Sequence, residues 1–163
     1  MVRNRSTIIL LFFAAVVFIT FNSCDPSKKY IKEEAEAIQD YLSSNNNLDF
    51  VEQPSGLYFY EIVAGTGTSP VSDDSAFVKY TGMFLDGTVF DSNVSLSSLY
   101  GFIVGENITG FDEGITLMSE GGKATFLLPS SLAYGSYGQY PIKGYTPLIF
   151  EVELIKVVPG PWR

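Results

Sequence analysis

The chain has 163 residues, of which 46% are hydrophobic and 15% aromatic, so it is long enough for one domain with short appendages and too apolar for a disordered chain. Its 18 acidic residues against 10 basic ones give a net charge of −8, which disfavours nucleic acid as a partner because phosphates are repelled. The chain has no histidine and a single cysteine, Cys24. This composition excludes Ser-His-Asp and Cys-His catalysis, histidine-based metal sites and an intramolecular disulfide.

The first residues have the pattern of a secretory signal. Arg3 and Arg5 precede an apolar run over Thr7–Phe21, and Cys24 follows shortly after. A transmembrane anchor is the alternative, but such a helix normally needs about 20 apolar residues and this run is shorter. The arrangement resembles a bacterial lipoprotein signal, which implies removal of residues 1–23 and a lipid on Cys24. The protein would then be anchored to a bacterial membrane in the cell envelope and would face the periplasm or the exterior.

Residues 28–43 follow a short tether and show the periodicity of an amphipathic helix. Apolar side chains recur among lysines and glutamates at Tyr30, Ile31, Ile38, Tyr41 and Leu42. Ser27 stands at the edge where a helix cap is expected, and the run Asn45–Asn47 marks the end. Two interpretations stay open: a helix that dimerises or binds a partner, and a spacer that packs on its own domain. The oligomeric state is not predicted.

Beyond Gly56, short apolar runs separated by Gly, Ser and Pro predict an antiparallel sheet. The Asp86-Gly87 pair, placed between Phe84 and Val89, predicts a tight hairpin turn. The strand candidates are Leu57–Val63, Ala76–Phe84, Val89–Phe90, Phe102–Val104, Ala124–Leu128 and Leu148–Lys156.

One short helix is expected among these strands. Phe111, Ile115 and Met118 fall on one face at helical spacing, and Thr109 with Asp112 predicts a capping box at the start. The expected fold class is therefore α+β, with an antiparallel sheet of about five strands wrapped around one short helix and preceded by the N-terminal helix.

Four stretches together carry a family resemblance. They read YTGMFLDGTVFDS, ITGFDEGI, LPSSLAYG and PLIFEVELIKV. In order and spacing they resemble FKBP-type peptidyl-prolyl isomerases over residues 56–158, which implies a half-barrel sheet with a shallow apolar pocket between sheet and helix. Residues 24–55 would then be a lipid-anchored tether with a short helix, and residues 159–163 a C-terminal tail.

The resemblance also implies the site residues. Those expected to be catalytic are Tyr80, Phe90, Asp91, Tyr134 and Phe150. Those expected to bind substrate are Tyr100, Ile108, Phe111 and Ile142. Taken singly, the phenylalanines would be ordinary core residues and Asp91 a solvated carboxylate, but their joint occurrence in the family's order favours a pocket.

The chemistry that this implies needs no metal, cofactor or nucleophile. Rotating an amide costs about 18–20 kcal/mol because conjugation is lost, so a site that binds the twisted amide better than the planar one accelerates the rotation. The implied partners are proline-containing polypeptides, with macrolides of the rapamycin class as further ligands.

Two departures from the family pattern leave alternatives open. Phe111 stands where active members often have tryptophan, and Lys143-Gly144, in the loop 136–146, stands where many have a proline pair. A catalytically weak FKBP-like module that binds a polypeptide, or a subunit of an envelope assembly, is therefore the alternative to an isomerase that assists the folding of exported proteins.

Overall fold

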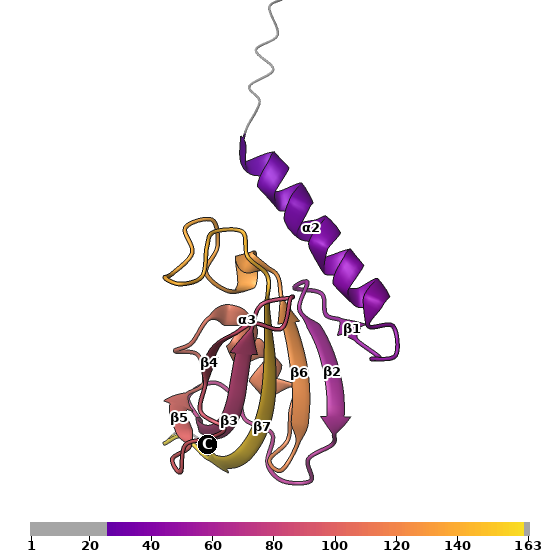
Figure 1. The fold of residues 1–163 in the computed structure, drawn as a ribbon. Helices are drawn as coiled ribbons and strands as arrows, with labels where there is room; N and C mark the ends of the chain where they lie inside the picture. The colour runs from indigo at the N-terminus through magenta and orange to yellow at the C-terminus, as the bar shows by residue number, and fades with distance from the viewer. Residues whose placement is uncertain (1–25, 162–163) are drawn as a thin grey trace, which may run out of the picture.

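The computed structural model describes residues 26–161, in which an antiparallel sheet curves around a short helix and a longer helix lies outside it (Figure 1). The expected signal and Cys24 lie outside the described residues. Over residues 26–161, no helix combines the length and the apolar character needed to cross a membrane.

The sheet has seven strands in the order β1-β2-β6-β7-β3-β4, and β5 also pairs with β3. All of these pairs are antiparallel. The α+β class expected from the sequence is confirmed, and the sheet exceeds the expected five or so strands partly because β1, of two residues, has no sequence periodicity. The strands are β1 Val51–Glu52, β2 Tyr58–Val63, β3 Ser75–Met83, β4 Val89–Ser92, β5 Tyr100–Ile103, β6 Lys123–Leu128 and β7 Leu148–Val158.

The inner helix, α3 (Thr109–Thr116), packs on the concave side of this sheet. Gly114 allows a close approach, because a Cβ there would lie 2.6 Å from ring carbons of Phe126. The predicted capping box is wrong: Ile108 is the N-cap residue and no side chain caps the helix. Asp112 instead accepts a hydrogen bond from the backbone N–H of Asn107 at 2.9 Å, so its carboxylate fixes the loop that enters the helix.

The outer helix, α2 (Pro26–Ser44), begins one residue before Ser27, which therefore lies within the helix and not at its cap. Its residue Ile38 is only 4% exposed and forms a second core cluster with Leu127 and Ile149. Because Ile38 covers Leu127 of β6 and Ile149 of β7 from outside, the end of β6 and the start of β7 are buried on both faces. One face of this helix thus packs on its own domain, while Tyr30 (49%) and Ile31 (54%) remain exposed.

Candidate functional site

A cavity of about 250 Å³ opens between α3 and the sheet. Eight of the nine residues expected at the site line it, and Asn107 lines it as well. The lining residues are Tyr80, Phe90, Asp91, Tyr100, Asn107, Ile108, Phe111, Tyr134 and Phe150. The structure thus brings together residues from two strands of the hairpin, the entry to α3, β5, β7 and the connection between β6 and β7.

The hairpin wall, residues 80–92 of β3 and β4 with their turn, forms one side. The turn is closed by a hydrogen bond from the Gly87 N–H to the Phe84 carbonyl at 3.0 Å, with Gly87 at a φ of +83°. Gly82 leaves room for the aromatic lining, because a Cβ there would lie 2.7 Å from the ring of Phe90 and 3.0 Å from that of Phe150. The rings of Phe90 and Phe150 therefore pack against β3 at Gly82, where the strand has no side chain.

Tyr80 and Asp91 form the polar part of this wall. The Tyr80 hydroxyl donates a hydrogen bond of 2.5 Å to Oδ2 of Asp91. Burial and this bond to the carboxylate raise the pKa of the Tyr80 hydroxyl well above its ordinary value. Tyr80 therefore stays a neutral donor, and its hydrogen bond holds the Asp91 carboxylate at the cavity.

Two polar residues that sequence analysis missed fix the backbone behind this wall. The buried Asn93 accepts a hydrogen bond from the Tyr80 N–H at 2.7 Å and donates one to the Val78 carbonyl at 3.0 Å. The Lys79 ammonium donates to the carbonyls of Asn93 (3.1 Å), Ser98 (3.0 Å) and Leu96. Such contacts between side chain and backbone leave no periodic signal in a sequence.

Phe111 forms the floor of the cavity and is 4% exposed. Its ring centroid lies 5.2 Å from that of Phe150 and 6.1 Å from that of Tyr80, both in edge-to-face geometry. Tyr100 lies 5.5 Å from Tyr80 and donates a hydrogen bond of 3.0 Å to Oδ1 of Asn107. Asn107 was not predicted as a site residue, and the only sequence signal for it was its position directly before the expected Ile108.

Two hydrogen-bond donors at the cavity have no acceptor within residues 26–161. They are the Tyr134 hydroxyl and the backbone N–H of Ile108, the residue that precedes the first turn of α3. Burial, followed by the charge of Asp91, raises the pKa of the Tyr134 hydroxyl, so this group stays protonated. A cavity that combines aromatic rings with two free donors is suited to a ligand that presents an apolar ring beside carbonyl oxygens.

Ile142 is the expected site residue that does not line the cavity. It is 6% exposed and belongs to the main core. The loop around it folds back through reciprocal backbone hydrogen bonds of 2.8 and 2.6 Å between Gln139 and Ile142, so Ile142 anchors the loop. The loop instead exposes Tyr137 (97%) and Tyr140 (98%) to solvent.

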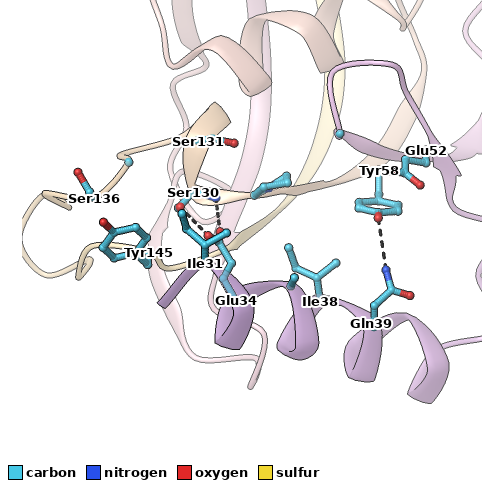
Figure 2. A pocket seen from close by; sticks show the side chains of 14 residues that line it. Ile31, Glu34, Ile38, Gln39, Glu52, Tyr58, Ser130, Ser131, Ser136 and Tyr145 are labelled. Carbon is cyan, nitrogen blue, oxygen red and sulfur yellow. Dashed lines mark hydrogen bonds between the residues drawn. The ribbon is translucent and has the colours of Figure 1, made fainter. Parts of the chain in front are cut away.

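A larger hollow, of about 490 Å³, lies between α2 and the domain (Figure 2). None of the nine expected site residues lines it. We assign the candidate site to the smaller cavity, because aromatic rings, a carboxylate and two free donors converge there.

Comparison with known proteins identifies the architecture. The family model described as FKBP-type peptidyl-prolyl cis-trans isomerase matches residues 67–155. This chain belongs to that family. The family resemblance carried by the four sequence stretches is confirmed, and so is the enzyme class that it implied, the FKBP-type peptidyl-prolyl cis-trans isomerases.

Relatives and solved structures agree with this assignment. The chain is 39% identical over 120 residues to the isomerase FkpA of Aeromonas hydrophila, covering 73% of this chain and 45% of the relative. It is 41% identical to the outer membrane protein MIP of Legionella longbeachae, covering 77% and 55%. The crystal structure of a peptidyl-prolyl cis-trans isomerase from Pseudomonas syringae pv. tomato superposes with a TM-score of 0.72 and 29% identity, covering 82% of this chain and 97% of that one. The chain thus spans about half the length of the two sequence relatives.

Proposed function

We propose that this protein is a peptidyl-prolyl cis-trans isomerase that assists the folding of exported polypeptides. The observation that carries the proposal is the cavity in which Phe90, Phe111 and Phe150 surround a volume flanked by the free donors of Tyr134 and Ile108. A proline side chain fits such an apolar volume, and the neighbouring carbonyls of the peptide are acceptors for the two donors.

Catalysis at this site is non-covalent. The planar amide is more dipolar than the twisted one, so transfer from water to a site against the aromatic rings of the cavity destabilises the planar form more. Uncatalysed isomerisation takes tens to hundreds of seconds. An acceleration of about four decades requires roughly 5–6 kcal/mol, since each decade corresponds to about 1.4 kcal/mol. Desolvation and two hydrogen bonds formed more strongly with the twisted amide can supply this amount.

Asp91 and Tyr80 contribute to the rotation of the amide through electrostatics. The carboxylate of Asp91 lies at the cavity and accepts the hydrogen bond of Tyr80, so its charge has a fixed position. A fixed negative charge interacts with the changing dipole of the rotating amide without the reorganisation that water would need. The proposed reaction requires no cofactor and no metal.

The test is an isomerase assay with an X-Pro tetrapeptide. The described domain should accelerate cis-to-trans conversion, and either Phe90→Ala or Asp91→Leu should reduce kcat/KM about a hundredfold, since each removes a group that lines the cavity. Val89→Ala, at an exposed position of the same hairpin, is the matched control. A folded wild-type protein without any acceleration would sink the enzyme proposal.

A catalytically weak polypeptide-binding module is the second candidate. It is favoured by Lys143-Gly144 in place of a proline pair and by the exposed rings of Tyr137 and Tyr140 in the same loop. The same assay separates the two candidates, because a module would bind an X-Pro peptide in a fluorescence titration without accelerating its isomerisation. Binding of a rapamycin-class macrolide should block the cavity in either case.

The location that we propose is the bacterial cell envelope, with the protein held by a lipid on Cys24. The support is the order of Arg3, Arg5, the apolar run Thr7–Phe21 and the cysteine. In cells given a labelled fatty acid, the wild-type protein should carry the label and Cys24→Ser should not. Equal labelling of both proteins would contradict the proposed anchor.

A further inference from the structure

Helix α2 contacts both ends of the rim segment, residues 129–147, which joins β6 to β7 and carries Tyr134. We propose that Glu34 and Tyr30 of α2 are positioning residues for the isomerase site: they hold the rim segment in the conformation that presents the Tyr134 hydroxyl to the peptide. This inference rests on the proposed function and adds to it a part of the chain that lies outside the family match at residues 67–155.

The first contact joins Glu34 to Ser130 across 96 positions of sequence. The Glu34 carboxylate accepts a hydrogen bond from the Ser130 N–H through one oxygen and from the Ser130 hydroxyl, at 2.8 Å, through the other (Figure 2). Ser130 is 5% exposed, and a buried N–H without a partner is strongly unfavourable. Glu34 therefore provides the acceptor for the N–H of the first residue of the short helix η1 (Ser130–Leu132).

The second step connects Ser130 to Tyr134. The Ser130 carbonyl accepts hydrogen bonds from the N–H groups of Ala133 (2.9 Å) and Gly135 (2.8 Å), which flank Tyr134 on either side. The Tyr134 carbonyl in turn accepts from the Gly138 N–H at 3.1 Å. Because the backbone around Tyr134 is closed onto Ser130, a shift of Ser130 shifts the tyrosine.

The second contact of α2 lies at the other end of the rim segment. Tyr145 has a φ of +56°, the left-handed region that is uncommon for residues other than glycine. Its N–H donates to the Gly135 carbonyl at 2.9 Å, and its ring stacks on that of Tyr30 with centroids 5.3 Å apart and planes inclined by 17°. The stacking on α2 stabilises this unfavourable backbone conformation of Tyr145. The hydrogen bond from Tyr145 to Gly135 then connects Tyr145 to the residue that follows Tyr134.

The larger hollow between α2 and the domain supports this assignment. It is bordered by α2 on one side and by rim residues such as Ser131, Gly135 and Ser136 on the other (Figure 2). Glu34 and Tyr145 are among its lining residues, so the Glu34–Ser130 and Tyr30–Tyr145 contacts lie at the edges of this hollow. Since open space lies between them, these two contacts, and not continuous packing, connect the rim segment to the helix.

The test measures kcat/KM of the full chain with an X-Pro tetrapeptide. Glu34→Ala should lower kcat/KM five- to tenfold, whereas Glu34→Gln should stay within twofold because its amide can accept from the Ser130 N–H and donate to the hydroxyl. Glu36→Ala is the matched control, since it removes only an exposed pair with Lys32 at 3.5 Å on the same helix. Tyr30→Ala, at a half-exposed position, should lower kcat/KM about threefold and Tyr30→Phe should not.

A double-mutant cycle with Tyr134→Phe separates positioning from general destabilisation. If Glu34 acts through the Tyr134 hydroxyl, Glu34→Ala should change kcat/KM less than twofold once that hydroxyl is gone. An equal fall in both backgrounds, or a wild-type value for folded Glu34→Ala, would overturn the inference. If Glu34→Ala does not fold, an unchanged kcat/KM of Tyr30→Ala would overturn it. An inactive wild-type protein would overturn the proposed function itself, an outcome distinct from these.

Discussion

The hairpin wall and the rim segment contribute to the same cavity, but different kinds of contact hold them in place. In the hairpin wall, Tyr80 and Asp91 are 11 positions apart, and the turn at Gly87 and the hydrogen bonds of Asn93 all lie within about 15 positions. In the rim segment, Ser130 depends on Glu34, which is 96 positions away. The wall is held by contacts between residues that are close in sequence, whereas the start of the rim segment is also held by a contact with the distant outer helix.

This difference has a consequence for mutations. Changes at buried positions of the hairpin wall, such as Gly82, should reduce stability and activity together, because a larger side chain there would collide with the rings of Phe90 and Phe150 that line the cavity. Loss of the Tyr134 hydroxyl in the rim segment should reduce activity with little loss of stability, since no group within residues 26–161 bonds this hydroxyl.

Among the variants that compare the hairpin wall with the rim segment, the largest effect is expected for Gly82→Ala. The added methyl would lie 2.7 Å from the ring of Phe90 and 3.0 Å from that of Phe150, so one or both rings must move. Overpacking of this kind lowers the free energy of unfolding by about 1–3 kcal/mol, and kcat/KM should fall more than tenfold because the displaced rings line the cavity. Urea unfolding and the tetrapeptide assay measure the two effects.

The control for this variant is Thr88→Ala, at an exposed position of the same hairpin. It should leave kcat/KM within twofold. If Gly82→Ala lost stability but kept full activity, the rings of Phe90 and Phe150 would not be the part of the wall that matters to the peptide.

A smaller effect, confined to activity, is expected for Tyr134→Phe. No group within residues 26–161 bonds the Tyr134 hydroxyl, so its removal should leave the free energy of unfolding unchanged. Loss of one hydrogen bond to the peptide, about 1–1.5 kcal/mol, corresponds to roughly a tenfold fall in kcat/KM. Tyr137→Phe, with a side chain 97% exposed, is the control and should behave as wild type; an unchanged kcat/KM for Tyr134→Phe would remove this hydroxyl from the mechanism.

A two- to threefold fall in kcat/KM is expected for Lys79→Met. The substitution keeps the aliphatic stem but removes the ammonium that donates to three carbonyls, including those of Asn93 and Ser98. The connection that leads from Asn93 to Tyr100 should then exchange its amide hydrogens faster. Unchanged exchange over residues 93–98 would show that the ammonium is not needed to order this connection; Lys156→Met, at an exposed position of β7, is the control.

The sequence predicted the locally encoded wall better than the rim. Alternation along β3 and the Asp86-Gly87 turn predicted the hairpin, and the structure places Tyr80, Phe90 and Asp91 at one cavity. Ile142 was expected at the cavity but is buried in the core, because the loop closes through Gln139. Neither the hydrogen bond from the Asn107 N–H to Asp112 nor the Glu34–Ser130 contact has a periodic pattern. Pairings between distant polar residues depend on a tertiary arrangement that a single sequence does not specify.

The smallest expected effect is that of pH on kcat/KM. It tests the hairpin wall through Tyr80 and the rim segment through Tyr134. Burial comes first among the causes that raise the pKa values of Tyr80 and Tyr134 above the ordinary 10.0, and the carboxylate of Asp91 adds to it. Both hydroxyls should therefore remain donors, and kcat/KM should be constant from pH 7 to about 10. A fall with an apparent pKa below 9 would mean that one of these hydroxyls ionises more easily than its surroundings allow.

Stability should respond to the same groups with a definite sign. Below pH 10 the tyrosines are protonated in both the folded and the unfolded chain, so their contribution is fully present. Above pH 10 the unfolded chain loses these protons first while the folded chain retains them, and the free energy of unfolding must decline as pH rises. Tyr41 and Tyr58, whose pKa values are also raised by burial, add to this decline. Tyr134→Phe should make the decline shallower in urea unfolding between pH 9 and 11 without altering its direction, whereas an unchanged slope would mean that the rim tyrosine is no more buried in solution than in the unfolded chain.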